Sequence, residues 1–558
     1  MGREYDPVTL GILWDKLASM ADEIYTSFCR TSFTPLVREA FDAIAALFDG
    51  QGRLLAQASF GPPSFIGTLP QTLHIFLKKF PKETWNPGDI IATNDPWLGT
   101  GHLNDLSMVR PVFHKDELVA FTGTVNHLPD VGGMLWSTMA SEVYEEGFRL
   151  PPCRIVENGE PNEDVIDIIQ NNIRIGDQVM GDIRSAITAN HVGEALMIEF
   201  LEEYRIEDLD ALTEAILNTS EEVMRERIRQ IPNGIYTYQL YTEGIVEPIK
   251  IVCSVEVGDD EITVDFEGTS KAVDRGINVP LVYTTSYSRY AVKCVVSPTL
   301  PNNDGSIKPI LVTAPEGCIL NAPPPSPVAG RHVIGHFAPL AVWGALAKVV
   351  PDRVIADTGL ITMVQFTGED ARGKRFSIPL FSMGGMGARP DDDGVDTMAV
   401  PTNVSNISYE VLEDFALGCL LTEKRELITD SGGPGRFRGG LGQEILIKNL
   451  SPKPIIISFM ARNTEYPPKG YHGGLPGTKT ETYINDEPVH PKGRFHLDPD
   501  SQVKIRIAGG GGFYDPHERA VSKVLDDVRQ GYVSLEAAKK YYGVIVDPTT
   551  MEAHRVGC

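Results

Sequence analysis

The sequence lacks several features that would place it in a specialised class. No apolar run reaches the roughly 18 residues that a membrane-spanning helix needs, and the N-terminus has no signal-peptide core. The seven cysteines stand singly, with no Cys-x-x-Cys pair, which is typical of reduced, buried thiols and argues against a disulfide framework or structural zinc. We therefore expect a cytoplasmic protein without a membrane partner.

Positive charge is scarce as well. The chain has 50 Lys and Arg against 75 Asp and Glu, for a formal net charge of −25. Such a balance argues against nucleic acid or an anionic membrane as a partner. The sequence also has no Gly-x-Ser-x-Gly motif and no Walker motif, so neither a serine nucleophile nor a bound nucleotide is indicated.

The most informative stretch is residues 89–133. Two β-rich runs, 106–113 and 118–125, are joined by the polar residues 114–117 and predict a hairpin. A hairpin brings the start of its first strand beside the end of its second. We therefore expect Asp105 and His127 to be neighbours.

His102, three residues before Asp105, completes a candidate metal site. Two imidazoles and a carboxylate suit zinc, manganese or iron, and three protein ligands leave positions open for water or substrate. An isolated His-x-x-Asp is commonly just a polar turn, but His127 at the facing strand end favours a metal, because buried imidazoles need partners. The metal would activate water or polarise a carbonyl, and Asp130 would orient a ligand imidazole or serve as base.

Two further groups of polar residues are weaker candidates. Asp42 lies in an apolar run, where a carboxylate needs a metal, Arg38 or backbone donors to offset its burial. His332 and His336 have helical chelating spacing, but they fall near a helix start, where capping roles are ordinary.

Three glycine clusters, residues 384–390, 431–442 and 508–513, invite a nucleotide-binding interpretation. None has the Walker pattern or an unambiguous strand-loop-helix setting. We interpret the three clusters as tight turns at sheet corners.

The motif residues resemble the hydantoinase B/oxoprolinase family, which includes B subunits of ATP-dependent N-methylhydantoinases and subunits of acetone and acetophenone carboxylases. The resemblance covers nearly the whole chain. The matching residues are Asn94-Asp95-Pro96-Trp97, Gly99, His102, Asp105, His127 and Asp130-Val131-Gly132-Gly133.

The resemblance implies one subunit of a two-component, ATP-dependent enzyme that hydrolyses a cyclic amide of the hydantoin, oxoproline or lactam type. A hydantoinase A-type partner would bind ATP and Mg in a hetero-oligomer such as a heterotetramer. The resemblance also favours Asp42 near one divalent metal, with zinc the first choice and manganese or iron the alternatives. One departure is Phe65, in the loop where many relatives carry His, so the substrate can differ from theirs.

Two alternatives stay open. The chain could be a subunit of an ATP-dependent ketone carboxylase, or a scaffolding subunit whose His and Asp residues are purely structural. We favour the hydrolase because the chain lacks the long insertions associated with acetone carboxylase.

We expect an α+β fold with several lobes, because the first 230 residues show both helical and hairpin patterns and the pattern changes toward a period of two from Gly234. The expected parts are a helical and hairpin N-terminal metal-binding region at 1–204, a helical connector at 205–233, a mixed β/α lobe at 234–400 and a β-rich C-terminal lobe with terminal helices at 401–558.

Overall fold

The structure is a computed structural model that describes residues 5–206, 209–398, 400–404 and 407–556. It divides into two compact units, each built from segments far apart in the sequence. The first unit comprises Met1–Trp136, Ala140–Tyr236 and Cys253–Pro339, and the second comprises Ser137–Met139, Thr237–Val252 and Leu340–Cys558. Helices and several antiparallel sheets confirm the predicted α+β class.

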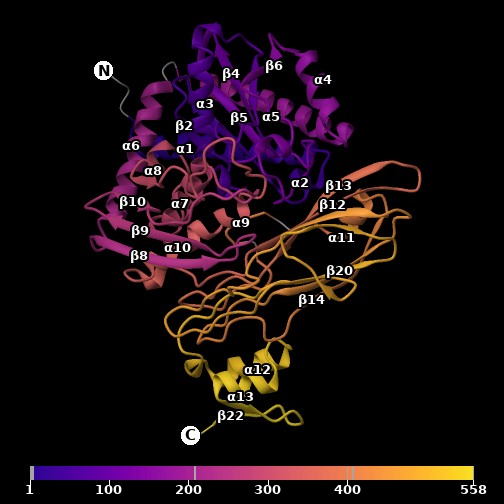
Figure 1. Ribbon diagram of the computed structural model, residues 1–558. Helices are drawn as coiled ribbons and strands as arrows, with labels where there is room; N and C mark the ends of the chain where they lie inside the picture. The colour runs from indigo at the N-terminus through magenta and orange to yellow at the C-terminus, as the bar shows by residue number, and fades with distance from the viewer. Residues whose placement is uncertain (1–4, 207–208, 399, 405–406, 557–558) are drawn as a thin grey trace. The chain divides into compact units, whose positions relative to one another are not determined.

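A seven-stranded sheet forms the centre of the first unit, with strand order β2-β1-β5-β4-β3-β6-β7 (Figure 1). Its strands are β1 (Ala43–Asp49), β2 (Leu54–Gln57), β3 (Ile90–Thr93), β4 (Asp105–His114), β5 (Glu117–His127), β6 (Cys153–Glu157) and β7 (Glu160–Pro161). The helices around it are α1 (Pro7–Thr31), α2 (Pro35–Arg38), α3 (Thr68–Lys79), α4 (Glu163–Asn172), α5 (Gly176–Glu203) and α6 (Leu209–Ile228), with the 3-10 turns η1 (Pro63–Phe65), η2 (Lys82–Thr84) and η3 (Val143–Glu145).

Helices cover both faces of this sheet. A Cβ on Gly193 of α5 would lie 2.3 Å from Oγ1 of Thr122, whereas a Cβ on the adjacent Gly123 would lie 2.9 Å from Leu69 of α3. Because successive strand residues point to opposite faces, α5 and α3 lie on opposite sides of β5. The end of β5 that carries the candidate ligand is therefore fully buried.

The β4–β5 hairpin has the predicted juxtaposition, since Asp105 pairs with His127 in register. The connection is shorter than the four residues expected. Only Lys115 and Asp116 form the turn, both with positive φ (52° and 65°), the conformation that favours two-residue hairpins. The predicted long connection was wrong because the strands extend their pairing through His114 and Glu117.

Helix α1 follows the sequence pattern closely. The Asp6 side chain accepts hydrogen bonds from Val8 N and Thr9 N, and Pro7 opens the helix. Apolar residues at helical spacing, among them Leu17 and Ile24, are buried. The helical spacing of apolar residues within 7–30 predicts an amphipathic helix, and the structure confirms it.

The remaining elements of the first unit include a four-stranded sheet of order β11-β10-β9-β8. Strands β8 and β9 and helix α10 each contribute residues to both units. The bounds are β8 (Gly234–Thr242), β9 (Ile249–Val257), β10 (Ile262–Asp265), β11 (Ile310–Thr313), α7 (Leu281–Val296), α8 (Asp304–Ile307), α9 (His332–Gly335) and α10 (Phe337–Leu346).

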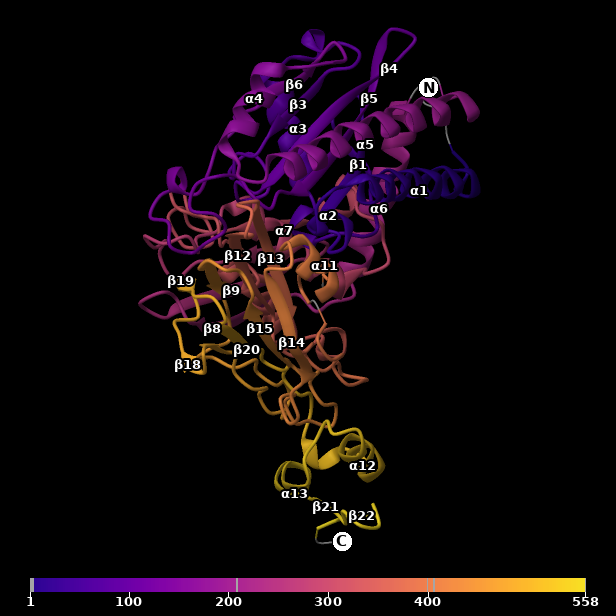
Figure 2. The same cartoon turned by 90° about the vertical axis from the view of Figure 1, so that its right-hand side faces the viewer.

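The two larger antiparallel sheets of the second unit have the order β13-β12-β16-β19 and β14-β15-β20-β17-β18 (Figure 2). Apolar side chains from both sheets, including Phe366, Ile457, Ile447 and Ile505, form one core. The bounds are η4 (Pro351–Arg353), β12 (Ile361–Glu369), β13 (Arg375–Met383), α11 (Tyr409–Phe415), β14 (Leu420–Leu427), β15 (Gln443–Asn449), β16 (Ile455–Met460), β17 (Glu481–Ile484), β18 (Glu487–Pro488), β19 (Arg494–Leu497) and β20 (Gln502–Arg506).

The C-terminal residues form a small module with its own apolar core around Val524, Ala538 and Tyr542. Ser534 caps the second helix by accepting from Ala537 N. The elements are η5 (Pro516–Glu518), α12 (Val521–Arg529), α13 (Leu535–Tyr542), β21 (Val544–Val546) and β22 (Ala553–Arg555).

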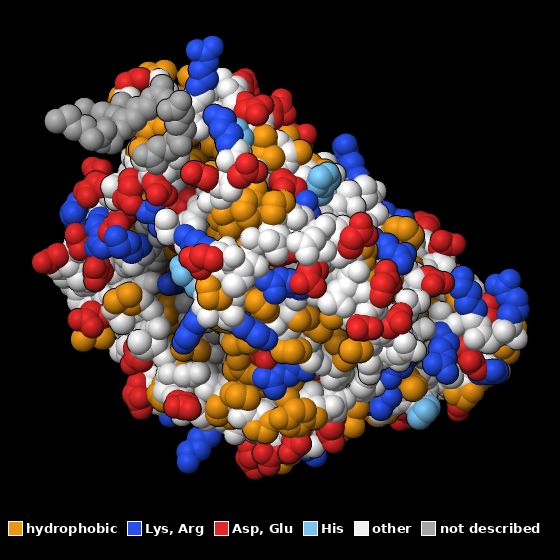
Figure 3. Space-filling view, turned by 90° about the horizontal axis from the view of Figure 1, so that it is seen from above, with side chains coloured by type: hydrophobic (Ala, Val, Ile, Leu, Met, Phe, Trp, Pro, Cys, Tyr) orange, Lys and Arg blue, Asp and Glu red, His pale blue; other side chains and the backbone are white. Residues whose placement is uncertain are grey.

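Surface features agree with the composition. Acidic side chains are spread among basic ones over the face shown in Figure 3. Within the described ranges, no helix combines the length and the apolarity needed to cross a bilayer.

The three glycine clusters do not form the tight turns expected from the sequence. None of their glycines has a positive φ. Instead, their backbones hydrogen-bond to one another, with Gly440 N donating to Met386 O (2.8 Å) and Gly510 N donating to Gly440 O (2.9 Å). The prediction was wrong because these glycines permit neighbouring backbones to approach closely. From the sequence alone, a glycine needed for close packing cannot be distinguished from a glycine needed for a turn.

We expect Gly385→Ala to destabilise the protein strongly. A Cβ at Gly385 would lie 1.8 Å from the carbonyl oxygen of Gly440, and neither backbone can yield without breaking the glycine cluster. The cost should reach or exceed the range of about 1–3 kcal/mol that is typical of overpacked sites. Thermal unfolding should show a lower midpoint.

Gly11→Ala is the matched control, because a Cβ added at this position in helix α1 would have nothing within 4 Å of it. It should raise stability by up to about 1 kcal/mol. Equal midpoints for the two variants would contradict the role of close backbone packing.

Candidate metal centre

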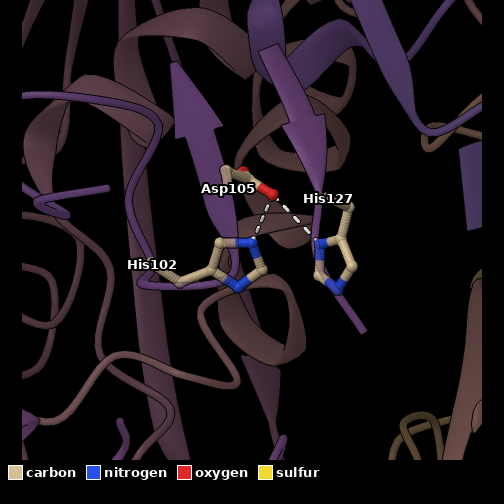
Figure 4. Close-up of side chains that lie close together, drawn as sticks. All are labelled: His102, Asp105 and His127. Atoms are coloured by element: carbon tan, nitrogen blue, oxygen red, sulfur yellow. Dashed lines mark hydrogen bonds and ion pairs between the residues drawn. The ribbon is translucent and has the colours of Figure 1, made fainter. Parts of the chain in front are cut away.

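His102, Asp105 and His127 converge on one point in the first unit (Figure 4). Each offers one ligand atom, and these atoms all lie within 4.8 Å of one another. All three side chains are buried. Asp105 opens β4 and His127 ends β5, so the hairpin register itself brings them together, as the sequence predicted. We call these three residues the ligand group.

The Asp105 carboxylate has a different set of partners on each oxygen. Oδ1 lies 2.7 Å from Nε2 of His102 and 3.0 Å from Nδ1 of His127. Oδ2 accepts hydrogen bonds from Nη2 of Arg331 (2.6 Å) and from the Thr100 hydroxyl. One oxygen is thus anchored by cationic and hydroxyl donors, and the other faces the two imidazoles.

Arg331 was not predicted from the sequence as part of the site. It lies 226 residues after Asp105, and its Nε also donates to the Thr100 carbonyl at 2.9 Å. A Cβ at Gly101 (φ +106°) would lie 2.7 Å from Cδ of Arg331. Gly101, next to His102 in the motif, therefore leaves space for the Arg331 side chain. Within the motif, this glycine is the sequence feature that reflects the contact with Arg331.

The charges of the site follow from burial and from this arginine. Burial, reinforced by Arg331, lowers the pKa of His102 to about 3, so its imidazole is neutral near pH 7. Burial alone would raise the pKa of Asp105, but His102 and Arg331 hold it well below its ordinary value. The group therefore combines an ionised carboxylate with a neutral imidazole.

The hydrogen bonds of the imidazoles fit a bound cation. Nδ1 of His102 lies 3.3 Å from the carbonyl oxygen of Ala329 and must carry the proton, because a carbonyl only accepts. Its Nε2 lone pair then faces an ionised carboxylate oxygen 2.7 Å away, and a cation between the two atoms would make this contact favourable. Nε2 of His127 is buried and has no hydrogen-bond partner among the described residues. Neutral imidazoles with a carboxylate are a suitable donor set for zinc, manganese or iron.

Asp42 lies beside this group but outside it. Its Oδ2 is 3.9 Å from Nδ1 of His127, because β1 pairs with β5 and His127 N donates to the Asp42 carbonyl. Burial raises the pKa of Asp42 to about 6, although His127 opposes the shift. Arg38, the alternative partner, pairs with Glu39 instead. The role of Asp42 as a ligand stays a prediction.

Asp130 is engaged elsewhere in the first unit. Its carboxylate accepts hydrogen bonds from Gly132 N (2.9 Å), from Nη1 of Arg174 (2.9 Å) and from Arg174 N. These contacts tie the loop after β5 to the segment that precedes α5, and they indicate a positioning role. A catalytic role for Asp130 stays a prediction.

The rings of His332 and His336 lie near each other, at a centroid distance of 5.9 Å, but have different neighbours. Nε2 of His336 lies 2.9 Å and 3.1 Å from the hydroxyls of Tyr283 and Tyr287. The His332 ring packs against Trp136, at a centroid distance of 5.2 Å, and Trp136 in turn packs against the ligand group. Neither residue belongs to the ligand group.

Phe65 is a core residue in this chain. It lies in η1 with only 1% of its surface exposed. The hydroxyl of Ser286 on α7 donates to the carbonyls of Pro63 and Ile66 on either side of it. The residue therefore anchors its loop by packing.

Comparisons with known proteins agree with the observed fold. A family model described as hydantoinase B/oxoprolinase matches residues 6–516. The chain is 30% identical over 572 residues to the B subunit of a putative D-/L-hydantoinase of Pseudomonas sp. (strain NS671), covering 98% of this chain and 96% of that protein.

Two solved structures are similar as well. The crystal structure of the ATP-dependent caprolactamase from Pseudomonas jessenii superposes with a TM-score of 0.88 at 27% identity, covering 98% of this chain and 97% of that chain. The nucleotide-free structure of acetone carboxylase also gives a TM-score of 0.88, over 99% of this chain and 81% of that chain, but at 20% identity it shows the fold alone. From the family match and the 30% identity over nearly its full length, this chain belongs to the hydantoinase B/oxoprolinase family.

Proposed function

We propose that this chain is the metal-dependent subunit of a two-component, ATP-dependent enzyme that hydrolyses a cyclic amide of the hydantoin, oxoproline or lactam type. The observation that carries the proposal is the convergence of the ligand group on one buried point. Its relatives are named for hydantoins and caprolactam, and its family for oxoproline, which supports the substrate class.

His102, Asp105 and His127 would hold one divalent metal, with zinc the first choice, manganese or iron as alternatives, and Asp42 as a candidate further ligand. When bound, such a metal supplies a Lewis acid for water or for a carbonyl. Arg331 and Thr100 hold the Asp105 carboxylate in place, and the buried setting keeps His102 neutral and able to bind.

ATP with Mg would be bound by a partner subunit of the hydantoinase A type, in a hetero-oligomer such as a heterotetramer. The structure of the glycine clusters supports this division. Many of their N–H groups bond to neighbouring backbones, and added Cβ atoms would strike carbonyl oxygens at 1.8–2.6 Å. Backbone that is packed in this way leaves little space in which a phosphate could approach the remaining N–H groups. The isolated subunit should then be inactive.

We expect the purified protein to carry about one divalent ion per chain, held by three protein ligands. His102→Ala and His127→Ala should each remove most of it. His191→Ala is the control, because this histidine is exposed on α5. Elemental analysis of the purified chains gives the answer. Wild-type protein free of metal, or variants that keep it, would support a scaffolding subunit instead.

Coexpression with an ATP-binding partner should produce a complex that hydrolyses ATP only when a hydantoin, 5-oxoproline or a lactam is present. Either chain alone should show no turnover. Phosphate release and ring opening are the measurements. ATP use that requires both bicarbonate and a ketone would replace the hydrolase with the carboxylase alternative.

Substitutions of the Asp130–Arg174 pair separate a catalytic role of Asp130 from a positioning role. If the pair only positions the loop, Asp130→Asn and Arg174→Met should each lower the free energy of unfolding by about 2 kcal/mol. The double variant should then be little worse than Arg174→Met, which already loses the side-chain contact with Asp130 and the bond to the Gly133 carbonyl. Turnover that is lost in Asp130→Asn but kept in Arg174→Met would instead identify a catalytic carboxylate.

A further inference from the structure

One loop supports the ligand group from behind. We call residues 328–331 the support loop. This loop makes two contacts with the ligand group. The carbonyl of Ala329 receives Nδ1 of His102 at 3.3 Å, and Arg331 binds the Asp105 carboxylate. The same carbonyl accepts a hydrogen bond from Nε1 of Trp136 at 2.7 Å, and the Trp136 ring lies 4.5 Å from the His127 ring. The position of this loop therefore affects all three ligands.

Glu146 holds the support loop in place. Its Oε1 accepts hydrogen bonds from two successive backbone N–H groups, those of Val328 (2.7 Å) and Ala329 (2.8 Å). The residue is 2% exposed, and it lies 182 positions before Val328. The buried Glu146 side chain thus fixes the backbone of Ala329, whose carbonyl accepts the hydrogen bond from Nδ1 of His102.

The turn that carries Glu146 is itself tightly fixed within the first unit. Met134 N donates to the Glu145 carbonyl and Phe148 N to the Val131 carbonyl, both at 2.8 Å. A Cβ at Gly133 (φ +52°) would lie 2.5 Å from the Glu145 carbonyl oxygen, so only glycine allows this approach. The motif Asp130–Gly133 therefore has a structural role, because it positions the turn that carries Glu146.

We infer that Glu146 is a positioning residue that fixes the support loop and, through it, the side chains of the ligand group. The inference rests on the proposed function in so far as the ligand group binds a metal. No hydrogen bond links Glu146 to His102, Asp105 or His127 in the described part of the chain, so it acts only through the backbone.

The chemistry of the Glu146 carboxyl gives the inference a sharp test. Its second oxygen, Oε2, is buried without a hydrogen-bond partner among the described residues. Burial raises the pKa of Glu146 to about 8, even though the two backbone donors oppose the shift. Near pH 7 the group is then mostly a neutral acid whose carbonyl oxygen accepts both N–H groups, and the amide of glutamine imitates such an acid.

Glu146→Gln should therefore behave like the wild type, whereas Glu146→Ala and the shorter Glu146→Asp should misplace the support loop. In metal-free full-length protein, nitrogen NMR of labelled histidines reads the His102 tautomer, with His102→Ala used for assignment. Wild type and Glu146→Gln should show the proton on Nδ1, and the other two variants a mixture of tautomers. Zinc affinity, measured by competition with a chelator, should fall about 10- to 100-fold in those two variants.

Glu145→Ala is the matched control, since the Glu145 carboxylate beside Glu146 accepts its hydrogen bonds from the exposed Ser141. It should leave both measurements unchanged. A tautomer and a zinc affinity that survive in folded Glu146→Asp would overturn the inference, and so would a Glu146→Gln variant as impaired as alanine. If the wild type binds no zinc but the tautomer responds as expected, the positioning role stands and the proposed metal function fails.

Discussion

The in-register pairing of Asp105 with His127 at the end of the β4–β5 hairpin is the constraint on which the site depends. A shift of one residue in a β-ladder turns every side chain to the opposite face of the sheet. The two-residue turn at Lys115 and Asp116 sets the register, and packing on both faces of β5 holds it. The sheet thus places a carboxylate beside an imidazole.

Burying that carboxylate requires compensation, and distant parts of the chain provide it. An ionised group removed from water is tolerated only when charged or hydrogen-bonded partners replace the solvent. Arg331 and the Thr100 hydroxyl serve one oxygen of Asp105, which leaves the other for the two imidazoles. The same arginine helps to keep His102 neutral. Arg331 therefore has two effects: it anchors one oxygen of Asp105, and it helps to keep the His102 imidazole that faces the other oxygen neutral.

Glycine has two separate uses in this protein. Near the site, Gly101 and Gly133 have positive φ and allow Arg331 and the Glu146 turn to approach closely. In the second unit, the glycine clusters have no glycine with a positive φ, and many of their N–H groups bond to neighbouring backbone carbonyls. Side chains are excluded there because the backbones themselves are in contact. The clusters are thus a packing solution and do not form phosphate-binding loops.

The sequence by itself determined the features that depend on near neighbours. Alternation, turn residues and the Gly-x-His-x-x-Asp spacing are local, so α1, the β4–β5 hairpin and the ligand group could all be predicted. Only the tertiary structure revealed Arg331 and Glu146, and it alone showed that the glycine clusters are filled by backbone. Their contacts join residues 226 and 182 positions apart, or backbones from several segments. Such contacts depend on how elements that are far apart in the sequence pack together. This packing produces no periodicity or motif spacing in the sequence.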